Sequence, residues 1–468
     1  MKHIWKCLIS AAVLIALLAA LACTGDPAQP EESPALQAQP TAAFTPEPTE
    51  AIVEEVVVHT ETAQPAEQLT AGPTNTPEPT YTPEPMSTPE PTEAPTPEPT
   101  PVPTPAFVTI GAVGDIMIPS QIVADAKVAG GEYDFSVLFA PFAELFGSVD
   151  LMCGNLETPL AGEDGGYSQK KDEKGAFLFN APDSVLDALK SCGVDMITTA
   201  NNHCLDKGMQ GLYRTVETIR AAGFYQTGTY LNAEDRQPCV IEINGIRIGF
   251  VASTRKPNAN QLKRISDEEA QTAIGYLFNG ENPSEAVLND LARVREAGAE
   301  FVILFAHWDH ENDGPTADDT KKIAKQLLAA GADCIIGSHP HRIKGAEYVT
   351  VQRADGPYTG LVLYSLGNFT ANNRFELMVG LFAQITLQKD FETGRVTLYD
   401  AGVLPTFTIR RAGSGQQFTV LPVYADTSKI SGLSSPLTAS EIKNLEKARA
   451  HAFKRLGTVE GLRVLDEP

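Results

Sequence analysis

The sequence predicts an α/β fold from about residue 106 to the 420s. Apolar runs typical of β-strands alternate there with segments of helical periodicity, a pattern that indicates a largely parallel sheet. Several apolar runs end at a polar motif, and three of these motifs hold five of the eight histidines. Because ligands of parallel α/β sheets bind at the carboxyl ends of the strands, we expect the motifs to meet in one functional site.

The expected strands and helices alternate in order along the chain. We expect strands at five apolar runs that precede polar motifs: 107–113, 150–153, 195–199, 301–306 and 334–337. Helical periodicity predicts helices at four segments between them: 184–192, 209–222, 283–297 and 318–330. These elements together form the largely parallel sheet and its covering helices.

The remaining strands are expected to pair locally. Asn244-Gly245 separates two apolar runs and is a strong signal for a tight β-hairpin. Residues 358–409 are rich in Val, Leu, Phe and Thr, so we expect a second, more antiparallel sheet packed on the first. Residues 438–454 have the pattern of an amphipathic surface helix, and we expect the last residues to form a tail.

The first residues have the features of an export signal. Lys2 and Lys6 precede a short apolar run that ends in small residues, so residues 1–22 are predicted to be a signal peptide. Cys23 follows at once and resembles the cysteine of a bacterial lipoprotein box, although Ala20 stands where such boxes usually have Leu. We expect an extracytoplasmic, lipid-anchored bacterial protein. Secretion and an uncleaved anchor helix are the alternatives.

Residues 23–105 are predicted to be a disordered linker. Thr-Pro-Glu-Pro-Thr recurs at 45–49, 76–80 and 96–100, and residues 24–105 hold 14 acidic side chains and no Lys or Arg. A polyproline II chain at about 3.1 Å per residue would reach on the order of 250 Å. We therefore expect a tethered main domain at 106–425, followed by the C-terminal helix and tail at 426–468.

Charge and cysteine content exclude several classes of protein. The net charge is −23, and no Lys or Arg stripe suits a phosphate backbone, so nucleic acid is not an expected partner. The cysteines after the linker show no Cys-x-x-Cys pair, which favours buried thiols over disulfides or a zinc knuckle. They are Cys153, Cys192, Cys204, Cys239 and Cys334.

The polar motifs carry side chains that bind divalent metals. Asp115 ends the first predicted strand, and Asn155 and Glu157 follow the second at a spacing that points both to one side of an extended chain. A helix N-cap is the alternative role for Asp115. Asn202 and His203 follow the third strand, where simple turn formation is the alternative.

The last two motifs supply most of the imidazoles. His307 ends the most apolar strand, while Glu311 is expected at the rim of the site. In His339-Pro340-His341, the proline moves the preceding residue away from helical geometry. The two imidazoles then stand two residues apart and can face one cation together.

The motifs as a set resemble those of a known family. Gly-Asp-x-Met (114–117), Asn-Leu-Glu-x-Pro (155–159), Asn-Asn-His-x-x-Asp-x-Gly (201–208), His-Trp-x-x-Glu (307–311), His-Pro-His (339–341) and Ser-Leu-Gly-Asn-Phe (365–369) are similar to the signature series of the CapA family of capsule-synthesis and poly-γ-glutamate biosynthesis proteins. The resemblance implies a calcineurin-like metallophosphoesterase fold, an α/β sandwich of two mixed β-sheets flanked by helices.

The resemblance also implies roles for individual residues. It assigns one or two divalent ions, with Mn, Zn or Fe as plausible metals, to six ligands: Asp115, Glu157, Asn202, His307, His339 and His341. It assigns catalysis to His203, as general acid, together with Asp206 and Glu311. Met117 stands where the phosphoesterase pattern has a histidine two residues after its first Asp, and Glu157 stands where that pattern usually has an Asp, which leaves a single-metal site open. Asp309 replaces the Gly usual after His-Trp in the CapA pattern.

These expectations define a function with two alternatives. We expect a metal-dependent hydrolase domain that acts on an anionic polymer such as poly-γ-glutamate, in capsule biosynthesis, export or release. The sequence contains no Gly-x-x-x-x-Gly-Lys-[Ser/Thr] phosphate loop for a ligase. A non-catalytic assembly factor that partners membrane synthase subunits is one alternative, and a phosphoesterase that acts on wall phosphodiesters is the other.

Overall fold

The computed structural model describes residues 104–168, 170–171, 177–263, 265–411 and 415–466. The predicted signal peptide, Cys23 and the predicted linker lie outside the described residues. No helix among the described residues has both the length and the apolar character needed to cross a membrane. The described cysteines are free thiols, four of them buried, as the sequence predicted.

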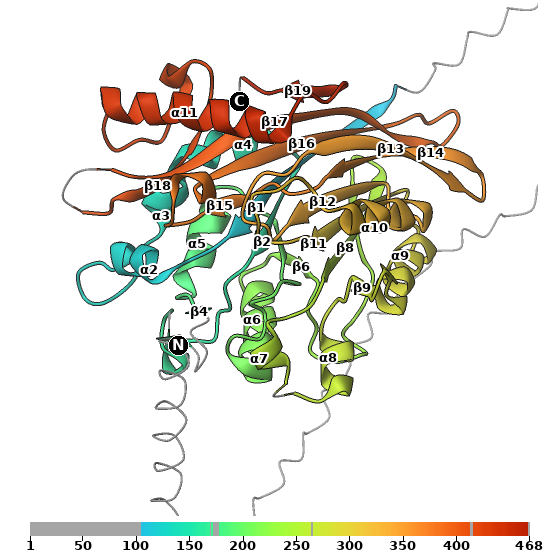
Figure 1. The fold of residues 1–468 in the computed structure, drawn as a ribbon, viewed down its shortest axis with the longest axis horizontal. Coiled ribbons are helices and arrows are strands. Elements are labelled where there is room, and N and C mark those ends of the chain that lie inside the picture. The colour runs from blue at the N-terminus through green and yellow to red at the C-terminus, as the bar shows by residue number, and fades with distance from the viewer. Residues whose placement is uncertain (1–103, 169, 172–176, 264, 412–414, 467–468) are drawn as a thin grey trace, which may run out of the picture. The chain divides into compact units, whose positions relative to one another are not determined.

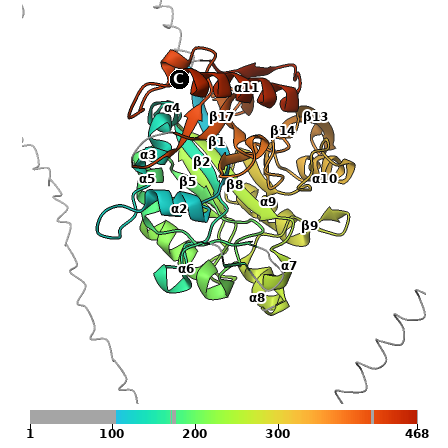
Figure 2. The ribbon, with the colours of Figure 1, turned by 60° about the vertical axis from the view of Figure 1, so that its left-hand side comes forward.

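The described residues form two mixed sheets with helices on their outer faces (Figures 1 and 2), which confirms the predicted fold class. The first sheet runs in the order β18-β17-β16-β1-β2-β5-β6, with β15 paired to β1 and β19 to β17. Its strands are β1 (Ala106–Ile116), β2 (Leu151–Leu156), β5 (Met196–Thr198), β6 (Tyr225–Thr227), β15 (Asn368–Thr370), β16 (Val379–Lys389), β17 (Val396–Arg410), β18 (Phe418–Pro422) and β19 (Leu462–Val464).

The second sheet runs in the order β13-β14-β12-β11-β8-β7. Its strands are β7 (Cys239–Ile243), β8 (Ile246–Thr254), β11 (Phe301–His307), β12 (Cys334–Ser338), β13 (Ala346–Arg353) and β14 (Gly356–Leu363). The predicted hairpin is present between β7 and β8, where Asn244 and Gly245 have φ angles of 49° and 75°. Two small hairpins pair β3 (Lys170–Lys171) with β4 (Phe177–Leu178) and β9 (Phe278–Asn279) with β10 (Asn282–Pro283).

The distribution of strands between the sheets differs from the prediction. The five strands that end at motifs do not share one parallel sheet: β1, β2 and β5 belong to the first sheet, and β11 and β12 to the second. The antiparallel strands β16 and β17 extend the first sheet instead of forming a separate one. Both sheets are buried on two faces, so continuous apolar runs did not reveal which strands pair.

The helices cover the two sheets on their outer sides. Their bounds are α2 (Ser120–Ala126), α3 (Ser136–Phe139), α4 (Ala143–Gly147), α5 (Ser184–Ser191), α6 (Gly208–Ala221), α7 (Ala259–Leu262), α8 (Asp267–Ala273), α9 (Glu285–Glu296), α10 (Asp318–Ala329) and α11 (Ala439–Leu456). Short 3₁₀ turns occur at η1 (Ala140–Phe142), η2 (Glu163–Gly165), η3 (Phe375–Leu377) and η4 (Thr427–Lys429). The four predicted helices correspond to α5, α6, α9 and α10, each within two residues at either end.

Strand β11 shows how the sheets and helices share the core. Alternate side chains of a strand point to opposite faces. Ile303 belongs to the large cluster that also contains residues of the first sheet, whereas Leu304 packs in a second cluster with Leu291 of α9 and Leu327 of α10. Since both faces of β11 are buried, its last residue, His307, is held rigidly at the end of the strand.

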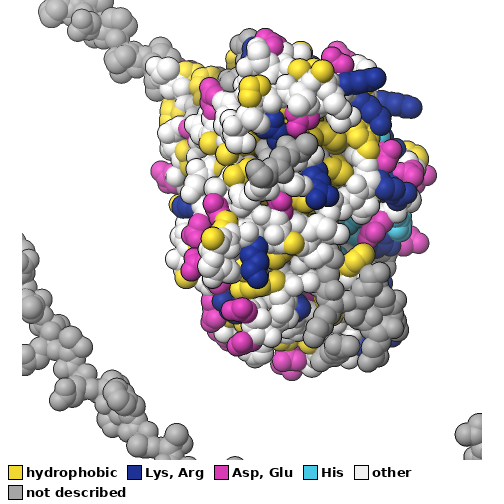
Figure 3. Space-filling view, turned by 90° about the vertical axis from the view of Figure 1, so that its left-hand side faces the viewer, with side chains coloured by type: hydrophobic (Ala, Val, Ile, Leu, Met, Phe, Trp, Pro, Cys, Tyr) yellow, Lys and Arg dark blue, Asp and Glu magenta, His cyan; other side chains and the backbone are white. Residues whose placement is uncertain are grey.

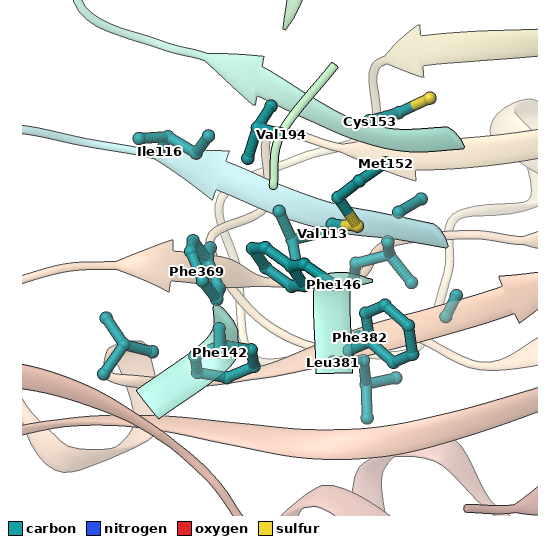
Figure 4. Close-up of a cluster of buried hydrophobic side chains, with 14 of the residues drawn as sticks. Val113, Ile116, Phe142, Phe146, Met152, Cys153, Val194, Phe369, Leu381 and Phe382 are labelled. Carbon is teal, nitrogen blue, oxygen red and sulfur yellow. The ribbon is translucent and has the colours of Figure 1, made fainter. Parts of the chain in front are cut away.

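An aromatic cluster packs against the first sheet, near the strand ends that the motifs follow (Figure 4). Phe142 and Phe369 make an edge-to-face contact with ring centroids 4.9 Å apart, and Phe146 packs on Phe382 of β16. Such pairs contribute about 0.5–1.5 kcal/mol beyond their buried area. Phe369 follows the motif residue Asn368 directly, so this packing fixes the position of Asn368.

The C-terminal residues join the core. Helix α11 lies along β16 and β17 (Figure 1), and Leu445 and Ala448 on its inner face are fully buried. The predicted tail is in part a strand: β19 pairs parallel with β17, and Leu465 packs where Gly402 leaves room for it. The sequence alone did not indicate this strand, because three residues are too few to show a period.

Candidate metal centre

Two groups of cation ligands meet at the carboxyl ends of β1, β2, β11 and β12. One group consists of Asp115, Glu157 and His341, and the other of Glu157, His307 and His339. In each group, one ligand atom of every residue lies within 4.8 Å of the others. Glu157 belongs to both groups, so its carboxylate would be shared if each group held a cation.

The distances place Glu157 between the imidazoles. Its Oε1 lies 3.5 Å from Nε2 of His307, and its Oε2 lies 3.7 Å from Nδ1 of His341. Asp115 also lies near His341, with its Oδ2 3.6 Å from Nδ1 of His341. Asn202 completes the set, because its Oδ1 lies 2.9 Å from His307 Nε2. All six predicted ligands are thus brought to one place.

Several polar atoms of the centre have no protein partner. Among the described residues, both carboxylate oxygens of Glu157 and Nδ1 of His339 are buried without a hydrogen bond. A buried carboxylate without a partner costs several kcal/mol, so such atoms indicate an unseen ligand. Carboxylates, imidazoles and an amide oxygen together suit a divalent transition metal. The residues present therefore fit one or two divalent cations.

The pKa shifts of the acidic residues also indicate that the centre suits a cation. Burial and the neighbouring Asp115 raise the pKa of Glu157 well above its usual value. Burial alone would lower the pKa of His341, but Glu157 and Asp115 outweigh it and raise that pKa to about 10. In the absence of a cation, the cluster of Glu157, Asp115 and His341 therefore keeps a proton, which a bound cation would replace.

The other two imidazoles are neutral. Burial and then the neighbouring His339 lower the pKa of His307 well below its usual value. Burial and then His341 lower the pKa of His339 to about 3. A neutral imidazole is the form that binds metal, so both rings offer a free lone pair at neutral pH.

The His-Pro-His segment differs from its predicted geometry. His339 and His341 have φ angles of 96° and 57°, in the left-handed region that non-glycine residues rarely adopt. The chain is therefore not extended here, and the two rings, with centroids 6.0 Å apart, enter different groups instead of facing one cation. Such backbone strain, of order 1–3 kcal/mol, is typical of functional sites.

A histidine–aspartate pair lies beside the ligands. Nδ1 of His203 lies 2.7 Å from Oδ2 of Asp206, which also accepts a hydrogen bond from the backbone N–H of Phe179. The ring of His203 packs edge-on against Phe179. With Nδ1 engaged, Nε2 is the atom available to exchange a proton with a substrate.

Glu311 occupies the mouth of the site. It is exposed and lines both hollows that open beside the ligands, one of about 610 Å³ and the other of about 410 Å³. His310, its neighbour, is also exposed. Both residues therefore lie at the rim, where the sequence placed them, and neither belongs to one of the two ligand groups.

Four residues hydrogen-bond to the ligands or to the chain beside them, a supporting role that the sequence did not predict. Asn155 donates to Asp115 Oδ1 at 2.7 Å, and Asn201 donates to the carbonyl of Leu156. The hydroxyl of Ser338 lies 2.9 Å from Nδ1 of His307, and Oδ1 of Asn368 lies 2.9 Å from Nδ1 of His341. All four stand in or beside the recognised motifs, but motif membership alone did not separate supporting residues from ligands.

The fold and centre define a two-sheet α/β protein with a buried cluster of side chains that could hold divalent cations. A family profile described as "Bacterial capsule synthesis protein PGA_cap" matches residues 109–373, which contain every predicted site residue. The chain belongs to this family of bacterial capsule synthesis proteins.

Similar proteins agree with this assignment. The chain is 27% identical over 266 residues to the "Capsule biosynthesis protein CapA" of Bacillus anthracis, covering 56% of this chain and 59% of that protein. It is 25% identical over 262 residues to the "PGA biosynthesis protein CapA" of Bacillus subtilis, covering 55% and 61%. The chain thus spans about three fifths of the length of these curated relatives.

One solved structure is similar in a more distant way. A crystal structure titled as a novel phosphatase of Mycoplasma pneumoniae covers 64% of this chain and 94% of its own. The sequence identity is 13% and the TM-score is 0.36.

Proposed function

We propose that this protein is a metal-dependent hydrolase that cleaves an anionic extracellular polymer during capsule or poly-γ-glutamate synthesis, export or release. The observation that carries the proposal is Glu157, whose buried and unpartnered oxygens are shared by two ligand groups beside the His203–Asp206 pair. The names of the Bacillus relatives support the process and the polymer.

The centre suits hydrolysis of a carbonyl or phosphoryl bond. Bound divalent cations would polarise the scissile group and lower the pKa of bound water toward neutrality. Asp115, Glu157 and His341 would hold one cation, and Glu157, Asn202, His307 and His339 the other. The ligands lie on strand ends with buried neighbours, which keeps them in place without rearrangement.

The protein's own residues complete the reaction. As the oxygen of water forms its bond to the carbonyl carbon or phosphorus, the bond to the leaving nitrogen or oxygen breaks. His203 gives the proton on Nε2 to that leaving atom, a step that contributes roughly 10²–10⁴-fold to the rate. Asp206 holds the imidazole in orientation through Nδ1. Glu311 at the mouth contacts substrate or water at the entrance.

We also propose where the reaction takes place. Residues 1–22 direct export, Cys23 is lipidated, and the Pro-rich residues after it carry the catalytic domain away from the membrane. The partners would be the polymer and subunits of the membrane synthase. The acidic Pro-Thr-Glu repeats and the small-residue cleavage motif support this proposal.

The test combines metal analysis with two substrates. The purified full-length protein would be analysed for bound Mn, Zn and Fe, then incubated with γ-linked oligoglutamate and separately with a phosphodiester reporter. We expect bound metal and cleavage of the oligoglutamate, both abolished by a chelator. Cleavage of the phosphodiester alone would favour a wall phosphoesterase. A protein without metal and without cleavage of either substrate would favour the non-catalytic assembly factor.

A further inference from the structure

The two hollows beside the centre meet at three residues. Asn202, Asn258 and Glu311 line both the wide hollow, of about 610 Å³, and the narrow hollow, of about 410 Å³. Both volumes are within the range of about 300–1,000 Å³ typical of small-ligand pockets. A flexible polymer that occupied both hollows would therefore cross the centre between them.

Each hollow receives a different part of the centre. His341 and His203 line the wide hollow, whereas His307 and His339 line the narrow one. The candidate acid therefore opens to the wide side alone. Since the acid must lie within hydrogen-bond reach of the leaving atom, the leaving part of the substrate belongs in the wide hollow.

Both hollows carry cations without an acidic partner. Among the described residues, Arg255 and Lys256 in the narrow hollow and Arg374 in the wide hollow have no carboxylate within 4.0 Å. The nearest polar partner of Arg255 is His310, at 3.3 Å. By contrast, Arg342 is neutralised by Asp313 at 2.5 Å. Figure 3 shows histidine atoms at the surface with basic and acidic side chains around them.

These three cations contrast with the negative net charge of the whole chain. Acidic residues outnumber Lys and Arg by 59 to 36, so the protein as a whole repels a polyanion. That repulsion is screened beyond roughly 8 Å at physiological salt, and recognition then depends on local contacts. The three cations, two in the narrow hollow and one in the wide hollow, supply such contacts.

We infer that the two hollows bind one anionic polymer chain across the centre, so that the chain is cleaved at an internal bond. The bound chain has a fixed direction, with its leaving side in the wide hollow. This inference rests on the proposed function and adds the binding mode. Arg374 contacts anionic groups on the leaving side, and Arg255 and Lys256 contact those on the side that keeps the carbonyl. For a γ-glutamyl chain, the oxygen of water bonds to the carbonyl carbon, the C–N bond breaks, and His203 protonates the leaving amine in the wide hollow. The water gives up a proton as the new carboxylate forms, and that proton restores the His203 imidazolium through solvent.

A binding measurement tests this inference independently of catalysis. The His203→Gln variant, loaded with metal, would be titrated with fluorescent γ-linked oligoglutamates extended from the same central bond toward the amino end, the carboxyl end, or both. In this background we expect Arg374→Gln to lower the binding affinity for oligomers extended toward the carboxyl end by about tenfold. This is the effect of losing one charge-assisted hydrogen bond, which is worth about 1.5 kcal/mol. Arg255→Gln/Lys256→Gln should weaken those extended toward the amino end. Lys325→Gln, an exposed cation of α10 outside both hollows, is the matched control.

Products give the second readout. The otherwise unaltered protein, acting on end-labelled polymer, should release fragments of intermediate length from the first minutes, because a chain bound in both hollows is cut internally. Release of single terminal units, or equal loss of affinity in the Lys325→Gln control, would overturn the inference while leaving hydrolysis intact. Side-specific binding without any cleavage would support the groove and refute the hydrolase proposal.

Discussion

The carboxylate of Asp309 and the ammonium group of Lys344 lie 3.9 Å apart, and neither side chain is exposed. Asp309 has a φ angle of 68°, a left-handed conformation that favours glycine, the residue usual here in the CapA pattern. Lys344 also donates to the carbonyls of Asn312 and Gly314. A buried cation thus holds the loop that carries Glu311 over the centre.

Loss of that cation should destabilise the protein. Lys344→Met leaves the buried Asp309 without its cation, with only the backbone N–H of His310 donating to it, which should cost about 3–5 kcal/mol in denaturant unfolding. Asp309→Gly should cost less, because it relieves the strained φ and leaves Lys344 its two carbonyl partners. The double variant should be more stable than the sum of the single effects predicts. A Lys344→Met protein within about 1 kcal/mol of the parent would contradict the role of the pair.

The two ligand groups predict a graded loss of metal. Measured by elemental analysis, His339→Ala and His341→Ala should each weaken one position, whereas Glu157→Gln should weaken both because Glu157 is shared. His203→Gln should keep the metal and lower turnover by roughly 10²–10⁴-fold. His451→Ala, on α11, is the histidine control. Equal metal content in all of these proteins would remove the basis for the metal centre.

Asn368 is expected to support the cation position at His341. Its Oδ1 lies 2.9 Å from His341 Nδ1, while its Nδ2 donates to the carbonyl of Leu377 and so fixes the amide orientation. Asn368→Ala should lower metal affinity about 10–100-fold, the usual cost of losing a residue that orients a ligand. Asn373→Ala, exposed on the rim of the wide hollow, should leave affinity unchanged in the same titration.

The sequence predicted the site better than the arrangement of the sheets. Each ligand follows an apolar run, and the sequence placed the ligands at the carboxyl ends of strands, where ligands of α/β sheets bind. Asp115 and His307 nevertheless meet across two sheets, because β1 and β11 belong to different ones. Which sheet a strand joins depends on packing between distant residues, and two-sided burial left no periodic signal in β1 or β11. The roles of Ser338 and Asn368 depend on side-chain distances that no motif specifies.

Acid should weaken the attachment of α11. Burial raises the pKa of Glu441, but the N–H of Thr438 and the guanidinium of Arg411 outweigh it and lower that pKa from its ordinary value of 4.5. A lowered pKa stabilises the fold above pH 4.5, and the benefit is lost as the pH falls through the lower folded value. Glu441→Gln should therefore cost about 0.5–1 kcal/mol at neutral pH and less at a pH well below 4.5. Unfolding curves at both pH values test this, with the exposed Glu446→Gln as control.

Cys23 should decide where the protein resides in the cell. A diacyl anchor provides the two chains that stable membrane attachment needs, so Cys23→Ser should move the protein from the membrane fraction to the medium. Cys7→Ser, within the predicted signal peptide, should leave fractionation unchanged. If Cys23→Ser stays in the membrane fraction, the mass of the protein identifies the reason: retention of residues 1–22 would indicate an uncleaved helix, and their loss would indicate a tightly bound membrane partner. Either result would rule out the lipid anchor as the attachment, while release into the medium would support it.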